Sequence, residues 1–214
     1  MRPAVVPTVL GLTLAVAAPT TWALTRPEAT AGAPVEQALR APPTPSTTEE
    51  APRVVARSAV PAAPEQRPAP VRLAVPARGV DTVVDPSGVG PDGQMALPAD
   101  VDRVGWYRFG PAPGDEGSAV LAGHVDDREQ GLGALAPLRD AAEGDEVVLT
   151  DAAGTETRWR IVSREVLQKQ VLPLDRLFAR QGPPRLTLIT CGGPFLAELG
   201  SYRDNVVVVA EPVR

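Results

Sequence analysis

Short apolar stretches, interrupted by glycine and proline, run from Val71 to the end of the chain at Arg214. Some of them alternate apolar and polar residues, which is the period-two pattern of a half-buried strand. In 157–162, for example, Trp159 and Ile161 alternate with two arginines, so one face is expected to be buried. Many short strands joined by such turns predict an all-β barrel or sandwich, with strands expected at 71–75, 117–123, 145–150, 157–162, 185–190 and 205–210.

The turns of this region favour the same fold class. Residues 152–154, Ala-Ala-Gly, stand between two of the expected strands and are typical of a hairpin. Helical patterns are brief and occur at 132–139 and 173–179. We therefore predict that 71–214 form one domain with a single core.

One histidine and one cysteine limit the chemistry of the whole chain. Zinc fingers and iron–sulfur sites need three or four such ligands, and a lone cysteine excludes an intramolecular disulfide. Residues 71–214 carry 15 basic and 21 acidic side chains, a net charge of −6. A surface of this sign is unsuited to nucleic acid. We predict no metal, no cofactor and no nucleic-acid partner.

The first 24 residues are predicted to be a signal or membrane-anchor segment. Residues 3–24 carry no charge, and Arg2 and Arg26 flank them. Such a length is just sufficient to cross a bilayer as a helix. The alternative is a secretory signal that is cleaved near Ala23. The first reading places the protein in the cell membrane with its head on the extracellular face, and the second makes it secreted.

Residues 25–70 differ in composition from the domain at 71–214. They contain ten prolines, no aromatic residue, and five charges of each sign. A segment of this kind buries too little apolar surface to offset the entropy lost on ordering. We predict a disordered, proline-rich linker that holds the domain away from the membrane.

Three side chains capable of chemistry stand at the ends of expected strands. Cys191 ends one strand just before a Gly-Gly turn, His124 follows another, and Arg203 begins the last one. Each has a simple structural interpretation: a buried thiol, a structural or exposed imidazole, and a surface arginine paired with Asp204. A single barrel could nevertheless gather the three strand ends at one rim.

Together, a thiol, an imidazole and a guanidinium suit acyl transfer. A thiolate is the nucleophile, and an adjacent imidazole can hold its proton and later deliver it to a leaving amine. A guanidinium provides a fixed positive charge and parallel donors for a developing oxyanion.

The residues around these three side chains resemble the signatures of the sortase family. Segment 187–191, Thr-Leu-Ile-Thr-Cys, fits the pattern TLxTC, and Ala-Gly-His at 122–124 is similar to the strand end that carries the sortase histidine. Segment 202–208 resembles the last strand of sortases, which bears their arginine. The spacings, 67 residues from His124 to Cys191 and 12 from Cys191 to Arg203, are usual for the family.

A finer pattern is similar to class F sortases. It consists of VDRVGWY at 101–107, AGHVD at 122–126, LITCGG at 188–193 and RDN at 203–205. The resemblance covers nearly all of 71–214 and none of the linker.

The resemblance implies a closed eight-stranded β-barrel with short helices, preceded by the hydrophobic N-terminal helix and the disordered linker. It implies an extracellular cysteine transpeptidase that cleaves an LPxTG-like sorting motif after its threonine and transfers the acyl group from a Cys191 thioester to an amine, commonly of a peptidoglycan precursor. His124 would be the general acid/base and Arg203 would stabilise the substrate and oxyanion. Thr190 and Gly192 would contribute to substrate binding. No acidic cluster matches the calcium site of some sortases.

Two other functions remain open on the sequence alone. The same three side chains would serve a secreted cysteine hydrolase, in which water resolves the thioester. A buried, inert Cys191 would instead indicate a stalked binding module without catalysis. Within the enzyme interpretations, Arg128 and Arg164 are the alternatives to Arg203. An L,D-transpeptidase is disfavoured, because its histidine lies two residues before the cysteine and this position is Ile189.

Overall fold

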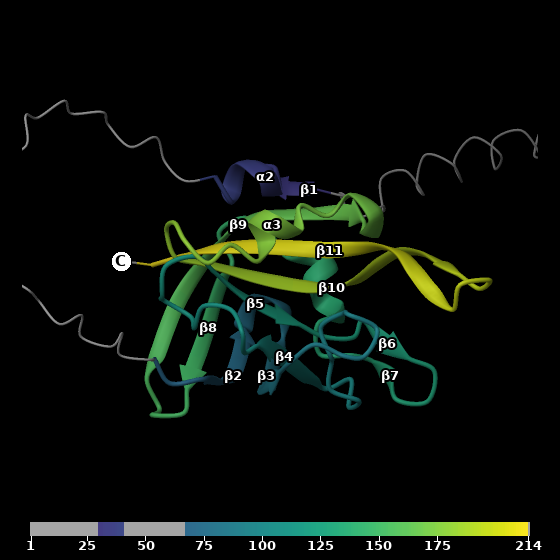
Figure 1. Ribbon diagram of the computed structural model, residues 1–214, viewed down its shortest axis with the longest axis horizontal. Coiled ribbons are helices and arrows are strands. Elements are labelled where there is room, and N and C mark those ends of the chain that lie inside the picture. Colours follow the sequence, from purple (N-terminus) through teal and green to yellow (C-terminus); the bar gives the residue numbers. More distant parts are fainter. Residues whose placement is uncertain (1–29, 41–66, 214) are drawn as a thin grey trace, which may run out of the picture.

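Eight strands close into a barrel in the computed structural model, which describes residues 30–40 and 67–213 (Figure 1). The strands follow one another around the barrel in the order β9-β11-β10-β5-β4-β3-β2-β8, and β8 pairs back onto β9. Most neighbours are antiparallel, and the pairs β3–β4 and β5–β10 are parallel. The predicted all-β barrel is thus confirmed, with strands β2 (Pro70–Val75), β3 (Val80–Ser87), β4 (Arg103–Tyr107), β5 (Ser118–Ala122), β8 (Glu146–Asp151), β9 (Glu156–Gln168), β10 (Arg185–Leu196) and β11 (Ser201–Pro212).

Strand β9 closes the barrel because it pairs with β11, its neighbour in the strand order, and also with β8 at the opposite end of that order. Its first residues pair with β8 across the hairpin expected at 152–154, and the stretch from Trp159 onward pairs with β11. The alternation seen in the sequence holds here, since Trp159 and Ile161 are buried while Arg158 and Arg160 are exposed.

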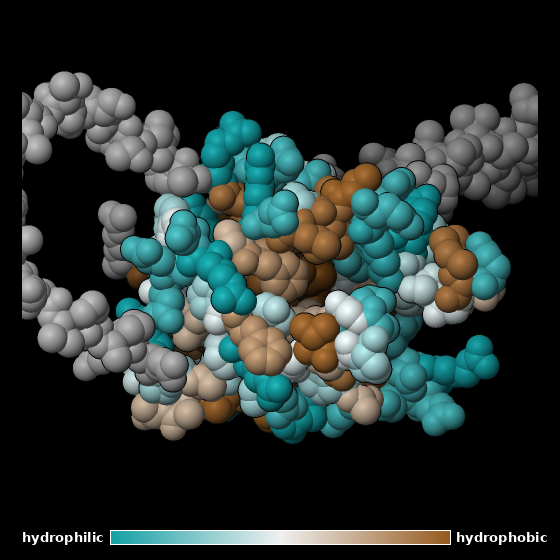
Figure 2. Space-filling model, in the orientation of Figure 1, coloured by the Kyte–Doolittle hydropathy of each residue, from teal (hydrophilic) through white to brown (hydrophobic). Residues whose placement is uncertain are grey.

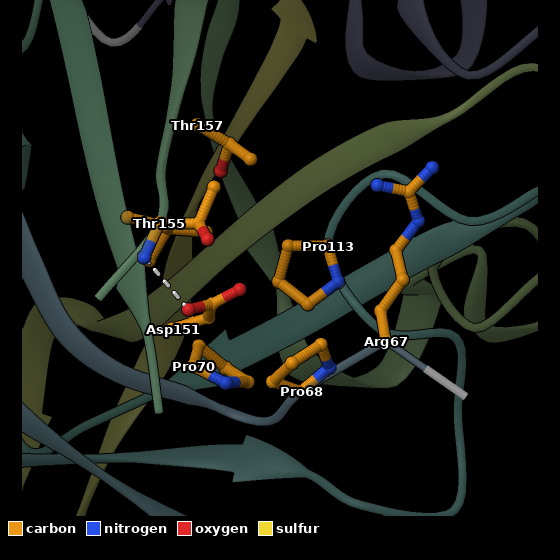
Figure 3. A pocket seen from close by; sticks show the side chains of 8 residues that line it. Arg67, Pro68, Pro70, Pro113, Asp151, Thr155 and Thr157 are labelled. Carbon is orange, nitrogen blue, oxygen red and sulfur yellow. Dashed lines mark hydrogen bonds between the residues drawn. The ribbon is translucent and has the colours of Figure 1, made fainter. Parts of the chain in front are cut away.

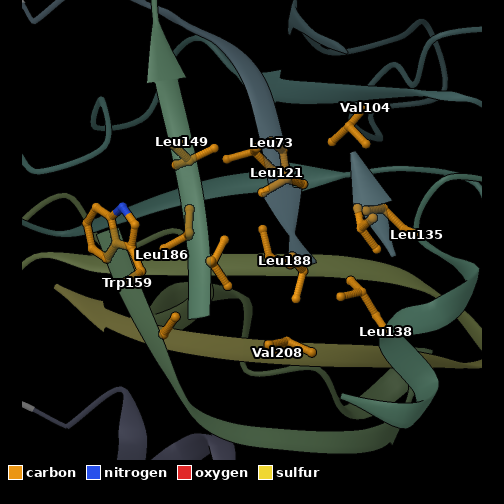
Figure 4. Close-up of a cluster of buried hydrophobic side chains, with 14 of the residues drawn as sticks. Leu73, Val104, Leu121, Leu135, Leu138, Leu149, Trp159, Leu186, Leu188 and Val208 are labelled. Carbon is orange, nitrogen blue, oxygen red and sulfur yellow. The ribbon is translucent and has the colours of Figure 1, made fainter. Parts of the chain in front are cut away.

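The interior is filled by aliphatic side chains that every barrel strand contributes (Figure 4). Leu73, Leu121, Leu149 and Leu188 come from four different strands and are almost fully buried. The 3-10 helix η2 (Ala136–Asp140) closes one side of this core with Leu138. Burial of this kind contributes about 25 cal/mol per Å² of apolar surface, so the core is the main stabilising element of the domain.

The remaining helices are short, as expected. Within 67–213 they are η1 (Pro76–Arg78), η3 (Lys169–Val171) and α3 (Leu174–Leu177), and α3 lies inside the helical pattern at 173–179. The pattern at 132–139 becomes η2, which begins later than expected. A two-stranded ribbon of β6 (Asp126–Asp127) and β7 (Gly131–Leu132) follows His124.

The central part of strand β11, residues 206–210, is buried on both of its faces. Val206 and Val208 point into the barrel core, whereas Val207 and Val209 belong to a second apolar cluster outside the barrel. Four consecutive valines fit this arrangement, since a strand covered on both faces has a continuous apolar run rather than an alternating one.

The prediction of disorder across 25–70 is wrong for residues 30–40 and for Pro70, which is buried and begins β2. Residues 30–40 form β1 (Thr30–Gly32), which pairs antiparallel with 163–165 of β9, and the single-turn helix α2 (Val35–Ala38). Local side chains explain the difference, because Val35 and Ala38 are buried in the second cluster although the average composition around them is proline-rich. The linker therefore cannot act as one free tether between residue 24 and the barrel.

The other N-terminal predictions lie outside the described residues, namely the segment 1–24 and the linker residues 25–29 and 41–66. Among the helices of 30–40 and 67–213, none has both the length and the apolar character needed to span a bilayer.

Candidate active site

The pairing of β5 with β10 brings His124 and Cys191 to the same rim of the barrel. The two strands are parallel, and Ala122 is the register partner of Ile189. His124 lies two residues beyond Ala122, just after the end of β5, and Cys191 lies two residues beyond Ile189. The expectation that Cys191 ends its strand before a Gly-Gly turn is wrong, because β10 continues to Leu196 and Cys191 still pairs with Asn205 of β11. The Gly123 N–H donates to the Ile189 carbonyl at 3.1 Å and extends the pairing to the point where the site begins.

Thr190 of β10 is joined through its side chain to Gly123, which follows the end of β5. Its hydroxyl donates to the Gly123 carbonyl at 2.9 Å, and the residue is only 2% exposed. The hydrogen bond spans the two strands directly beside Cys191. Thr190, predicted to bind substrate, therefore also holds the strand of the thiol against that of the imidazole.

Cys191 is half-buried and lies where two cavities meet. The first, of about 680 Å³, contains His124 and is called here the histidine-side cavity. The second, of about 370 Å³, is called the apolar groove. Leu97 lines both of them, as Cys191 does.

The apolar groove runs from Cys191 along the outer surface of β5 and β10 to α3. Figure 2 shows apolar side chains around a hollow near the middle of this face, with hydrophilic residues at its border. The groove can take an extended segment with apolar side chains, and its apolar walls are formed by Met95, Val120, Leu172, Leu174, Phe178 and Ile189.

The histidine-side cavity is more polar. A phenol and a carboxylate form part of its wall, since the Tyr202 hydroxyl donates to Asp126 Oδ2 at 2.5 Å. The ring of Tyr202 also makes an edge-to-face contact with Phe195, at 5.2 Å between centroids. These contacts tie the start of β11 to β6 and to the end of β10, and so define the shape of this cavity.

The hydrogen bond to Asp126 raises the pKa of Tyr202, and burial and the negative charge of Asp126 act in the same direction. A raised pKa in the folded state means that this contact stabilises the fold below the ordinary tyrosine pKa of about 10. This stabilisation is lost as the pH rises through the pKa of the folded state.

We expect Tyr202 to ionise above pH 10, and Asp126→Asn to lower the pH at which Tyr202 ionises. Ultraviolet difference titration against Tyr202→Phe measures both, and an unchanged transition in Asp126→Asn would contradict this cause.

Arg203 lies on the strand next to Cys191 but pairs with its own neighbour. Its Nε donates to Asp204 Oδ1 at 2.8 Å and its second nitrogen donates to Oδ2 at 2.9 Å. This pair of hydrogen bonds holds the pKa of Asp204 below its usual range, against the opposing effect of burial. Asn205 is the register partner of Cys191, and Arg203, two residues earlier in β11, lies where the register between β10 and β11 shifts. Arg203 lines neither cavity in this arrangement.

The two residues after Cys191 must be glycines, because neighbouring side chains leave no space for a Cβ at either position. A Cβ on Gly192 would lie 2.8 Å from a methyl group of Val206, and Gly192 lines neither cavity. Gly193 has a φ of 70°, and a Cβ there would meet Asp204 Oδ2 at 2.1 Å. Gly192, expected to bind substrate, thus has a packing role in the described structure.

A further cavity of about 260 Å³ carries no comparable chemistry (Figure 3). Prolines and threonines line it together with Arg67 and Asp151. Asp151 accepts hydrogen bonds from the backbone N–H groups of Ala153 and Thr155, so its carboxylate stabilises the β8–β9 turn. In the described part of the chain, no three His, Cys, Asp or Glu side chains gather as metal ligands would.

Four residues that shape the site have no role predictable from the sequence. Asp126 and Tyr202 occur in the quoted motifs, but nothing in the sequence indicates that they bond to each other across 76 positions. Leu97 and Phe195 lie in irregular or strand-end positions, where no periodicity signals a site.

Comparison with known proteins agrees with this architecture. Residues 73–213 match the family model of the sortase domain. No curated protein matches the chain. Sortase A of Listeria monocytogenes is 24% identical, with a TM-score of 0.51 and coverage of 68% of this chain and 88% of that one.

Two further solved structures share the fold at lower identity. A lid mutant of sortase A from Corynebacterium diphtheriae is 18% identical, with a TM-score of 0.52 and coverage of 71% and 74%. Sortase C-1 from Actinomyces oris is 19% identical, with a TM-score of 0.50 and coverage of 67% and 73%. These likenesses concern the fold, whereas the family model spans most of the chain. The chain belongs to the sortase family, a family of cysteine transpeptidases.

Proposed function

We propose that this chain is an extracellular sortase of the class F type. It would cleave an LPxTG-like sorting motif through a thioester at Cys191 and transfer the acyl group to a cell-wall amine. The observation that carries the proposal is the position of Cys191 at the junction of an apolar groove and a cavity that contains the only histidine of the chain. Such a junction suits a nucleophile that must meet first a peptide and then an amine.

The apolar groove supports a peptide substrate of this kind. Leu172, Leu174 and Phe178 offer contacts for the leucine and proline of the motif, and the end of the groove at Cys191 would receive the carbonyl carbon of its threonine. Immobilising an extended peptide there aligns the scissile bond with the thiol, which lowers the entropic part of the barrier.

The reaction then proceeds in two balanced steps. The Cys191 sulfur attacks the threonine carbonyl carbon, its proton having passed to His124. The bond to the following glycine nitrogen breaks, and His124 donates the proton to this leaving amine. In the second step an acceptor amine attacks the thioester, His124 takes its proton, and the carbon–sulfur bond breaks to restore the thiolate.

Incubation with an LPxTG peptide, with and without an added amine, tests this function. We expect a transfer product whose yield rises with the amine concentration. A product ratio that does not respond to the amine would indicate the hydrolase. Thiol alkylation of the folded protein tests the third reading, since a Cys191 that reacts only after denaturation would indicate a binding module.

Arg203 is proposed as the donor to the oxyanion, which requires it to leave Asp204. We expect Arg203→Ala to lower kcat/KM for the sorting peptide about 10²–10³-fold, the usual loss for one oxyanion donor. The matched control is Asp204→Asn, which weakens the same ion pair while keeping the guanidinium. This control should retain most of the activity.

If Arg203→Ala and Asp204→Asn lost kcat/KM equally, the ion pair between these residues would only support the fold. Turnover like that of the wild type by Arg203→Ala would show that another arginine acts. Arg128 would then be the first alternative, because it lines the histidine-side cavity. Arg164 is less suitable, since it is buried and donates to the Ala141 carbonyl.

A further inference from the structure

Residues 30–40, called here the clip, cover the outer face of β11. Val207 and Val209 would be exposed on a barrel alone, yet both are fully buried. They form the second apolar cluster with Leu177 of α3 and with Val35 and Ala38 of the clip. In Figure 1 the clip lies over β9 and beside α3, although 29 residues, 41–69, separate it in the sequence from the first barrel strand, β2.

Backbone pairing seats the clip on β9. Thr30, Ala31 and Gly32 extend the sheet beyond β9, and the Ala33 N–H donates to the Val162 carbonyl at 3.1 Å. Gly32 makes this approach possible, because its φ is 77° and a Cβ there would lie 2.3 Å from the Val162 oxygen.

Side chains of the barrel then hold the two ends of α2. The Val35 N–H donates to Glu165 Oε2 at 3.0 Å, and Arg185 Nε donates to the Ala38 carbonyl at 2.9 Å. Arg185 is itself paired with Glu211 at 3.0 Å. A further ion pair at 3.6 Å joins Glu36 of the clip to Arg176 of α3. Because these hydrogen bonds and the Glu36–Arg176 ion pair are directional, together they hold the clip in one position on the barrel.

The cluster under the clip is continuous with the wall of the apolar groove. Leu172, Phe178 and Ile189 pack against this cluster and also line the groove. Helix α3 connects the two sides, since Leu177 is buried against the clip while Leu174, which is 55% exposed, lines the groove.

We propose that the clip is a positioning element of the substrate site. Seating of Val35 and Ala38 holds 172–178 in the conformation that forms the groove wall, and release of the clip leaves this wall without its outer support. The proposal rests on the proposed function for its substrate, the sorting peptide, but its structural part is independent of activity. Val35 and Ala38 do not touch the groove and act through Leu177 and Phe178.

Gly32→Ala in the full chain tests the proposal, because the added Cβ would displace the clip from Val162. The matched control is Gly154→Ala in the β8–β9 turn, where φ is 82° and a Cβ meets no atom within 4 Å. Both variants carry the strain of a left-handed alanine, and only the first carries the clash. Ala38→Asp is a second releasing variant, since it places a carboxylate in the apolar cluster.

Hydrogen exchange and peptide kinetics are the two measurements. We expect Gly32→Ala and Ala38→Asp to increase exchange in 30–40 and in 172–178, and Gly154→Ala to change neither. For the sorting peptide we expect KM to rise about five-fold or more. kcat at saturating peptide should stay within about two-fold, because the chemistry at Cys191 is untouched.

The proposal would be overturned if a variant released the clip but kept the KM of the wild type for the sorting peptide. It would also be overturned if such a variant showed unchanged hydrogen exchange in 172–178. A clip that stays seated in both releasing variants would overturn it as well, because the named contacts would not be what holds it. A wild-type protein that cleaves no sorting peptide would contradict the proposed function instead. In that case the exchange of 172–178 still decides whether the clip supports the wall.

Discussion

Cys191→Ala is expected to abolish both cleavage of a sorting peptide and transfer to an amine. The sequence contains a single cysteine, so no other thiol can replace it. Removing the nucleophile of a covalent mechanism lowers the rate by about 10⁶-fold in the serine protease subtilisin, and a comparable loss would bring this enzyme below detection. Steady-state cleavage of a fluorogenic peptide, with mass spectrometry of the products, measures the effect.

Two controls make this result specific. The melting temperature of Cys191→Ala should stay close to that of the wild type, because the side chain is half-buried at the rim and not part of the barrel core. A thioester between Cys191 and the peptide should be trapped in the wild type and be absent from the variant. Residual cleavage with unchanged kcat in Cys191→Ala would show that the nucleophile lies elsewhere.

His124→Ala is expected to lower kcat by about 10²–10⁴-fold, the range found for positioned general acid–base groups. His124 and Cys191 line the same cavity, and no other imidazole exists in the chain. The thiol remains in place, so its alkylation should still be observed in the folded variant, although more slowly. Added imidazole should restore part of the activity, because the cavity of about 680 Å³ is large enough to admit it.

A substitution at another polar residue of the cavity provides the contrast. Ser201→Ala removes a hydroxyl from the wall without removing a proposed proton carrier, and we expect its kcat to fall by less than about ten-fold. If His124→Ala behaved like Ser201→Ala and did not respond to imidazole, the acid–base role would be assigned to the wrong residue.

Most of the barrel could be predicted from local patterns. Six strands were expected close to where they occur, because alternation such as that of Trp159 and Ile161 directly records which face is buried. Strands β3 and β4 were not among them. In β3 the buried residues Val80, Thr82 and Val84 alternate with exposed ones, but the strand ends at a Pro-Ser pair, which is not typical of a strand. Strand β4 pairs with β3 in parallel, and 15 residues separate the two strands in the sequence.

The error at 30–40 has a different origin. A composition averaged over 46 residues describes how much apolar surface a segment has, and it does not describe where a few apolar residues find a matching surface. Val35 and Ala38 meet Val207 and Val209, which lie some 170 residues further along the chain. The four consecutive valines of β11 were the available signal that something covers its outer face.

The sequence by itself determined the chemistry that this protein can perform. With one thiol and one imidazole in the chain, any Cys–His mechanism must use Cys191 and His124, and the family signature lies in the residues next to them. Only the tertiary structure decided what surrounds this pair, because those contacts depend on the register between strands. It placed Cys191 between two cavities, joined Tyr202 to Asp126, and brought 30–40 onto the cluster that continues into the wall of the groove.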